Sequence, residues 1–238
     1  MHEKEKWKIY KDVFDEPTMK AIAKLASDGY IQILHGTIAT GKEANVFYAE
    51  APDGRQLAVK IYRYETSSFE KMMRYIEGDN RFKTVKNRKR DIVEVWAKKE
   101  FKNLEKADKA GVKVPKPIIS RKNILVMEFI GENGISAPTA KDVPPKEPKL
   151  WLSKVLNSIK ALYQKEGLIH GDLSEYNILN FNEEPVLIDM GQGVLTDHPA
   201  AKELLMKDIT NILKWFNKLK VEVPTPEKVY EEVVGKEK

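Results

Sequence analysis

The fold is decided by one short stretch of the chain, which reads Ile169-His170-Gly171-Asp172-Leu173-Ser174-Glu175-Tyr176-Asn177-Ile178-Leu179 and is followed by Leu187-Ile188-Asp189. The apolar pairs Leu168-Ile169 and Ile178-Leu179 predict short buried strands, and Glu183-Glu184-Pro185 predicts the turn into a third strand over 186–188. A loop carrying Asp172 and Asn177 would then lie beside the strand end that delivers Asp189.

These three polar residues match the needs of phosphoryl transfer. Such a reaction uses one carboxylate to orient the attacking oxygen, and an amide with a second carboxylate to hold magnesium on the phosphates. The same residues also occur in ordinary polar hairpins, because Asp and Asn are common in turns. The assignment therefore needs support from a second, independent part of the chain.

That support lies upstream, where the pattern predicts three strands. The segment 31–38 is largely apolar, Val46-Phe47-Tyr48 resumes the strand pattern after a turn flanked by Gly36 and Gly41, and Pro52-Asp53-Gly54 turns the chain into a third strand over 57–61. Lys60 lies among the apolar residues of this third strand. A buried lysine is rare unless it is paired, although a solvated edge strand would also accommodate it.

The spacing Gly36-x4-Gly41-Lys42 resembles a P-loop, but the pattern fails at the next residue. A P-loop needs a Ser or Thr hydroxyl for magnesium and a following helix, whereas this chain has Glu43 and then a strand-like segment. We therefore expect a turn between two strands that covers the phosphates, as the glycine-rich loop of kinases does.

A helix predicted over 93–104, with Gly111 beyond its end, carries a partner for Lys60. Its apolar face has i, i+3, i+4 spacing and comprises Val93, Trp96, Ala97, Glu100, Leu104 and Ala107. A carboxylate on that face must be paired or neutralised, so we expect Glu100 to bind Lys60 and hold its ammonium against the phosphates. An exposed glutamate on a charged helix is the alternative.

In this order, these residues resemble the protein-kinase-like fold, and their details resemble the RIO atypical kinases. The segments that carry the resemblance are Ala39-Thr40-Gly41-Lys42-Glu43-Ala44-Asn45-Val46, His170-Gly171-Asp172 and Ile188-Asp189-Met190-Gly191-Gln192. The string from Thr40 to Val46 favours the first RIO subfamily, and an archaeal member of it. The resemblance covers about 16–219 and implies an α+β, two-lobed minimal protein-kinase-like fold with a reduced C-terminal lobe.

The resemblance also implies a division of the chain. Residues 1–126 would form an N-terminal helix and a β-rich nucleotide-binding lobe that includes a flexible insertion over 65–91. Residues 127–131 would be the hinge, and residues 132–238 the reduced catalytic lobe. Apolar periodicity predicts helices over 149–166 and 200–219, with Gly167 ending the first. Asp208 on the second helix would either bond the catalytic-loop backbone or face solvent, and His170 is expected to have a structural role.

The implied ligands are ATP and Mg, with Mn as a possible substitute. The implied site comprises Asp172 to orient the nucleophile, Asn177 and Asp189 as metal ligands, Lys60 and Glu100 at the phosphates, Thr40, Gly41 and Lys42 in the covering loop, Val46 and Ala58 as adenine walls, and the Glu128 carbonyl with the Ile130 amide as adenine partners. The resemblance further implies that Asp189 accepts the phosphoryl group, with Asp172 then orienting water. Transfer to Ser or Thr is the alternative.

Departures from ordinary kinases concern the acceptor. Gly171 replaces an Arg, Ser174 stands where many kinases carry Lys, and only 49 residues follow Asp189 in this sequence. We therefore expect no ordinary peptide-docking helices. By resemblance, the partner is a small ribosomal subunit precursor or its rRNA. The alternatives are a small-molecule kinase of the aminoglycoside or choline type and an assembly factor switched by ATP with little turnover.

Composition agrees with a cytoplasmic two-lobed chain. Lys and Arg number 41 against 36 Asp and Glu, a formal net charge of +5. Five cations fall within Lys83–Arg90, a run that would contact RNA or simply be solvated. With no cysteine, no long apolar run and no signal peptide, we expect no disulfide and no membrane partner. The sequence leaves the oligomeric state open.

Overall fold

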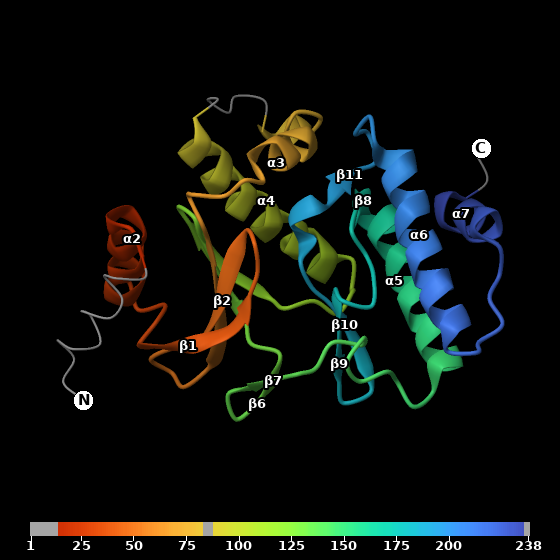
Figure 1. Ribbon diagram of the computed structural model, residues 1–238, viewed down its shortest axis with the longest axis horizontal. Helices are drawn as coiled ribbons and strands as arrows, with labels where there is room; N and C mark the ends of the chain where they lie inside the picture. Colours follow the sequence, from red (N-terminus) through yellow and green to blue (C-terminus); the bar gives the residue numbers. More distant parts are fainter. Residues whose placement is uncertain (1–13, 83–87, 236–238) are drawn as a thin grey trace.

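The computed structural model describes residues 14–82 and 88–235, which form two halves (Figure 1). The N-terminal half is built on an antiparallel sheet of order β1-β2-β3-β5-β4. Its strands are β1 (Ile33–Thr40), β2 (Ala44–Glu50), β3 (Gln56–Tyr62), β4 (Pro117–Arg121) and β5 (Ile124–Glu128). Short turns join β1 to β2, β2 to β3 and β4 to β5, as in the hairpins expected upstream from the sequence, whereas residues 63–116 separate β3 from β4.

The turn before β2 is shorter than predicted. We expected it to span the segment between Gly36 and Gly41, but β1 continues through Thr40. Two register irregularities, between Leu34 and Thr37 and between Thr37 and Ala39, let the strand pass Gly36 without ending. The β-branched residues of this segment suit a strand, so only Gly41 to Glu43 makes the turn.

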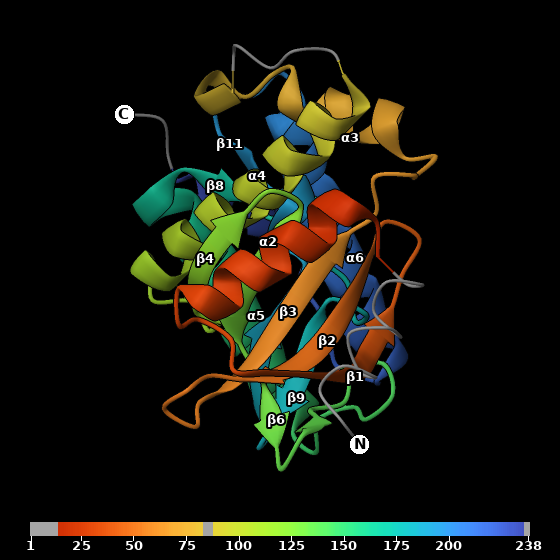
Figure 2. The same ribbon diagram turned by 90° about the vertical axis from the view of Figure 1, so that its left-hand side faces the viewer.

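Helices cover both faces of the sheet (Figure 2). Helix α2 (Glu16–Ser27) follows Asp15, whose side chain accepts a bond from the Thr18 amide, and packs Ile22 and Leu25 into the cluster under the sheet. Helix α4 (Lys89–Lys109) covers the opposite face. All six residues of its predicted apolar face are buried, so the helical periodicity was interpreted correctly.

The segment between β3 and α4 has structure that the sequence analysis missed. It contains α3 (Phe69–Ile76) and the 3₁₀ turn η1 (Asn80–Phe82), whose residues Met72, Ile76 and Phe82 pack against α4. Helix α4 begins at Lys89, inside the predicted insertion 65–91. Residues 83–87 of the basic run lie outside the described residues, and the predicted lobe boundaries and the mobility of the insertion stay predictions.

The C-terminal half combines three helices with short hairpins. Its helices are α5 (Pro148–Glu166), α6 (Ala201–Lys218) and α7 (Pro226–Val234), and its short elements are β6 (Gly131–Glu132), β7 (Ile135–Ser136), β8 (Leu168–Ile169), β9 (Ile178–Phe181), β10 (Glu184–Leu187), the 3₁₀ turn η2 (Met190–Gln192) and β11 (Val194–Leu195). The predicted helices over 149–166 and 200–219 are confirmed, and Gly167 ends α5 with φ 58°. Trp151 of α5 is buried in the core of this half.

One turn in this half differs from the prediction. Glu183-Glu184-Pro185 was expected to turn the chain, but Glu184 and Pro185 already belong to β10. The turn residues are Asn182 and Glu183, with φ 53° and 60°. Two consecutive positive φ values are typical of the tight hairpin turn whose twist matches the flanking strands, which moves the turn one residue toward the N-terminus.

The two halves together form the expected α+β, two-lobed kinase-like fold, in which α5, α6 and α7 follow the predicted hinge. Among the described residues, no helix combines the length and the apolarity that crossing a bilayer requires. In this arrangement the hairpin formed by β1 and β2 faces β9 and β10 of the C-terminal half (Figure 1).

Candidate active site

A cavity of about 600 Å³ lies between the two halves and gathers every predicted site residue. Its lining includes Thr40, Gly41, Lys42, Val46, Ala58, Lys60, Glu100, Glu128, Ile130, Asp172, Asn177 and Asp189. A cavity of this size, between lobes and lined by converging polar groups, is typical of a ligand site. The structure therefore brings these residues together, while the role of each stays a prediction.

Lys60 is the charged centre of this cavity. Its Nζ lies 2.9 Å from Glu100 Oε1 and 2.9 Å from Asp189 Oδ1, and its side chain is 11% exposed. Burial alone would lower the pKa of Lys60, but the charges of Asp189 and Glu100 outweigh it and raise the pKa above its usual value. The expected Lys60–Glu100 contact is thus present, and the lysine remains a cation that links β3 to α4 and to the end of β10.

Glu100 is almost fully buried, with a side chain 1% exposed. The hydroxyl of Tyr62, two residues after Lys60 on β3, donates to its second carboxylate oxygen. Burial raises the pKa of Glu100 against the opposing charge of Lys60. Both oxygens therefore have partners, which is the condition for keeping a carboxylate inside the protein. The sequence analysis did not identify Tyr62, although strand alternation places it on the same face as Lys60.

Asp189 follows β10 at the point where the chain turns sharply. Its φ of 61° turns the chain into η2, and its side chain is half exposed to the cavity. The positive charge of Lys60 is the largest influence on Asp189 and lowers its pKa, against the effect of burial. The carboxylate is consequently ionised at neutral pH and points into the same space as Lys60.

The predicted catalytic loop, residues 170–177, is held in place by contacts with α6. Asp208 accepts bonds of 2.7 Å from the backbone amides of Gly171 and Leu173, which decides between the two alternatives left open by the sequence. His170 is buried and its Nε2 lies 3.0 Å from the Ile188 carbonyl oxygen, a structural role as expected. These contacts fix the loop between α6 and the strand that leads to Asp189.

Asp172 lies on this loop and its carboxylate has two partners that the sequence analysis did not pair with it. Gln192 Nε2 donates to Oδ2 over 2.8 Å, and Lys207 Nζ of α6 lies 2.8 Å from Oδ1. Gln192 belonged to a recognised motif but had no assigned role. For Lys207, the only signal in the sequence was its position next to Asp208.

Asn177 and Asp189 supply the candidate metal donors. The Asn177 amide nitrogen donates to the Asp172 carbonyl oxygen over 2.8 Å, so the nitrogen is committed and the amide oxygen is the end left for a cation. Among residues 14–82 and 88–235 there is no group of three or more His, Cys, Asp or Glu suited to a metal. An amide oxygen with one carboxylate suits Mg²⁺, which is usually held by few protein groups together with phosphates and water.

Part of the cavity lining is apolar. It includes Val46 and Ala58 from the sheet, together with Met127, Leu179 and Ile188, which the sequence analysis had not assigned to the site. The predicted hinge residues Glu128, the last residue of β5, and Ile130 also line the cavity. A cavity that combines apolar side chains with a few polar groups is suited to a nucleotide base.

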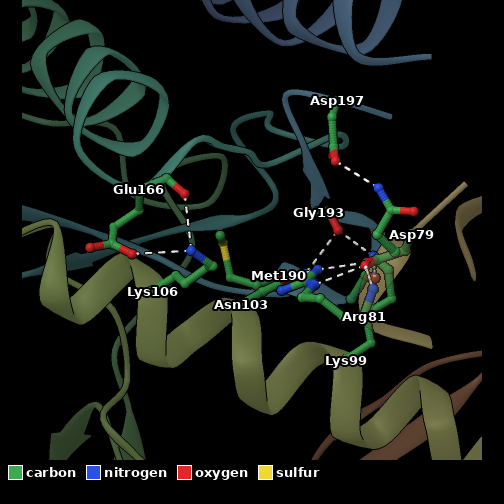
Figure 3. A network of polar contacts seen from close by, with 11 residues as sticks. Asp79, Arg81, Lys99, Asn103, Lys106, Glu166, Met190, Gly193 and Asp197 are labelled. Carbon is green, nitrogen blue, oxygen red and sulfur yellow. Dashed lines mark hydrogen bonds and ion pairs between the residues drawn. The ribbon is translucent and has the colours of Figure 1, made fainter. Parts of the chain in front are cut away.

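A second polar network joins α4 to the chain around η2 (Figure 3). Asp79 forms an ion pair with Arg81 at 2.6 Å, and Arg81 also donates to Asn103 of α4 over 2.9 Å. Asn103 in turn donates to the carbonyl oxygens of Met190 and Gly193 over 2.7 and 2.9 Å. The network therefore ties the insertion and α4 to the chain that follows Asp189.

Lys99 completes this network from the interior. It is fully buried, donates to the Gly191 carbonyl oxygen over 3.1 Å and also to that of Gly193. Burial lowers its pKa to about 7, with Asp79 opposing that effect. Lys99 thus binds the backbone of Gly191 and Gly193, while its neighbour Glu100 binds Lys60, the partner of Asp189.

The sheet, the helical half and the cavity with its lysine, two carboxylates and loop amide define a kinase-like phosphotransferase. The RIO domain model matches residues 45–229, and the chain belongs to the RIO family. The RIO-type serine/threonine-protein kinase Rio1 of Haloferax volcanii is 42% identical, over 98% of this chain and 80% of its own. The protein of the same name from Methanocaldococcus jannaschii is 39% identical, over 97% of this chain and 78% of its own.

A solved structure supports the fold. The Rio2 kinase of Chaetomium thermophilum, in a structure described as an ADP/Mg²⁺-phosphoaspartate complex, superposes with a TM-score of 0.69 at 24% identity. The match covers 92% of this chain and 67% of that one. The likeness confirms the two-lobed architecture expected from the sequence.

Proposed function

We propose that the chain binds Mg-ATP in the cavity and transfers its γ-phosphoryl group, acting as an atypical kinase with ATPase turnover. The observation that carries this proposal is Lys60, which lies 2.9 Å from both Glu100 and Asp189 in a cavity that also contains Asp172. A cation held by two carboxylates from separate elements is positioned for phosphates, and phosphoryl transfer depends mainly on such positioning and charge.

The metal site fits this proposal. The Asn177 amide oxygen and the Asp189 carboxylate would hold Mg²⁺, a hard cation that takes oxygen donors. When bound, Mg²⁺ would neutralise charge on the β- and γ-phosphates. Lys60 would then contact the phosphates, Glu100 would keep Lys60 in place, and the turn at Gly41 and Lys42 would cover the phosphates.

We propose Asp189 itself as the phosphoryl acceptor. Its carboxylate is half exposed toward the cavity and carries a lowered pKa, so it is available as an anion. One carboxylate oxygen would bond to the γ-phosphorus as the bond to the β–γ bridging oxygen breaks, with the electron pair leaving on ADP. The phosphoaspartate named in the Chaetomium structure supports this acceptor by analogy.

Release of phosphate would use Asp172. Water would bond to the phosphorus of the acyl phosphate, its proton would pass to Asp172, and the electron pair of the broken bond would return to the Asp189 carboxylate. The cellular role that the family resemblance favours is maturation of the small ribosomal subunit in the cytoplasm, with the precursor particle or its rRNA as partner. An ATP-switched assembly factor with slow turnover would use the same chemistry.

The acceptor is tested by the chemistry of the label. After a single turnover with γ-labelled ATP, wild type should carry label that hydroxylamine releases, because hydroxylamine cleaves acyl phosphates and leaves phosphoserine intact. Asp172→Ala should keep its label longer, and Asp189→Asn should carry none. Label that survives hydroxylamine and maps to a hydroxyl residue would show that Asp189 is not the acceptor. Absence of ATP binding and turnover in wild type would overturn the proposed function itself.

A further inference from the structure

The carboxylate of Asp172 is held from two sides by groups outside its own loop. Gln192, at the end of η2, donates to Oδ2, and Lys207, in the second turn of α6, lies 2.8 Å from Oδ1. Lys207 also donates to the Gly171 carbonyl oxygen over 3.3 Å. The lysine therefore contacts both the side chain that orients the nucleophile and the backbone that carries it.

The loop itself contains no cation that could do this. Residues 170–177 include neither Lys nor Arg, and Ser174 stands two positions after Asp172, where many kinases carry Lys. Lys207 brings an ammonium group to this position from a separate helix. The same helix supplies Asp208, whose carboxylate bonds the amides of Gly171 and Leu173. Helix α6 thus positions both the backbone and the carboxylate of the loop.

The contact has little value as an ordinary stabilising ion pair. The side chains of Lys207 and Asp172 are 42% and 36% exposed, and exposed ion pairs contribute about 0–1 kcal/mol. Burial opposes the charge on Lys207, but the bond to Asp172 outweighs burial and raises its pKa, so the ammonium stays protonated. A fixed cation at this place therefore affects mainly the direction in which the Asp172 carboxylate points.

We propose that Lys207 is a positioning residue that, opposite Gln192, orients the Asp172 carboxylate toward the attacking oxygen. This inference rests on the proposed function and deepens it. In the hydrolytic step, Asp172 takes the proton of water while the acyl phosphate on Asp189 breaks. Lys207 is not among the residues that line the cavity, and its polar contacts are with Asp172 and Gly171, so its contribution should fall on this step and not on nucleotide binding or on formation of the acyl phosphate.

The experiment separates the two steps in single turnovers with γ-labelled ATP. In Lys207→Met, which removes the charge and keeps the length, label should appear on the protein at the wild-type rate, and the KM for ATP should change less than about twofold. Release of phosphate should slow by about tenfold, because a misdirected base loses part of its 10²–10⁴-fold contribution. Lys207→Arg keeps the charge and should stay within about threefold of wild type.

Two further variants exclude a merely structural effect. Lys214→Met alters an exposed lysine of the same helix and should change neither rate. In an Asp172→Ala background, Lys207→Met should add no further slowing, because the group through which it acts is gone. A release rate equal to wild type in Lys207→Met, equal slowing of label formation and release, or a full additional loss in the Asp172→Ala background would each overturn the inference.

The hydroxylamine test shows separately whether the assignment of Asp189 as the acceptor is wrong. If the label proves stable to hydroxylamine, Asp189 is not the acceptor, and Lys207→Met should then slow transfer to the hydroxyl acceptor, which Asp172 would orient. A wild-type transfer rate in that variant would overturn the role of Lys207. If wild type neither binds nor consumes ATP, both the proposed function and this inference fall.

Discussion

Lys99 and Glu100 are neighbours on α4, both are buried, and each carries a charged group, yet they belong to different kinds of site. Glu100 turns toward the cavity, where it binds a lysine that also contacts the half-exposed Asp189. Lys99 turns toward η2 and donates to backbone carbonyls in a network closed by Asp79 and Arg81. A buried charged group therefore indicates a functional site only when one of its partners is exposed to a cavity.

The two clusters differ in what their loss would cost. The Asp79 carboxylate is fully buried and the Arg81 side chain nearly so, so removing a member leaves other charges buried. The Lys60 cluster faces a cavity of about 600 Å³, where water or phosphate can enter. We therefore expect the first cluster to control stability and the second to control turnover.

The largest expected effect comes from Asp79→Ala. It would leave Arg81 and Lys99 without their carboxylate and should lower the free energy of unfolding by about 3–5 kcal/mol. Urea denaturation measures this loss. Asp53→Ala, which breaks the exposed pair with Arg55, is the control and should cost less than about 1 kcal/mol. A stable Asp79→Ala protein that has lost ATP turnover would contradict the division between the clusters.

Lys60→Met should reduce ATP turnover by about 100-fold or more, because it removes the cation proposed to contact the phosphates. Its effect on unfolding should be smaller than that of Asp79→Ala, since Asp189 is half exposed and Glu100 can take up a proton. Single-turnover rates and denaturation curves on the same preparations measure both quantities. Turnover close to wild type would remove Lys60 from the proposed site.

Glu100→Gln should reduce turnover by about tenfold, which corresponds to about 1.4 kcal/mol. Glutamine keeps the volume and an acceptor for the Tyr62 hydroxyl, but it lacks the charge that holds Lys60. The fold should therefore survive with little loss of stability. Glu105→Gln, an exposed position on the same helix, is the control. Equal turnover rates in the two variants would show that the contact between Glu100 and Lys60 is unimportant for turnover.

The last prediction concerns pH. The pKa of Lys99 is about 7 in the folded chain, against the usual 10.5 of a lysine, so unfolding between pH 7 and 10 takes up a proton. Stability should consequently rise with pH in this window, by at most about 1.4 kcal/mol per unit, and should level off below pH 7, where both states carry the proton. Lys99→Met should flatten the curve measured by denaturation at pH 7 to 10. An unchanged slope would mean that Lys99 is charged throughout.

Local sequence patterns were sufficient to predict the burial of several residues, because burial follows from the periodicity of strands and helices. Lys60 lies in an apolar strand and Glu100 on the apolar face of a helix, so each was expected to need a partner, and 40 residues separate them in sequence. The segment from Asp172 to Asp189 is short enough for hairpin rules to place both ends on one side. Even there, the turn proved to lie at Asn182 and Glu183, because backbone twist rather than composition selects it.

Contacts between distant elements were decided only by tertiary structure. The alternation of apolar residues on α6 left Asp208 between two interpretations and gave no sign that Lys207, 35 residues beyond Asp172, would contact its carboxylate. Likewise, nothing local indicated that Lys99 would contact a carbonyl 92 residues away. Periodicity states which face of an element is buried, whereas the packing angle and offset between elements decide which polar group meets which. For that reason the sequence was sufficient to predict the fold and the residues that line the cavity, and the packing of α4 and α6 decided how those residues are held.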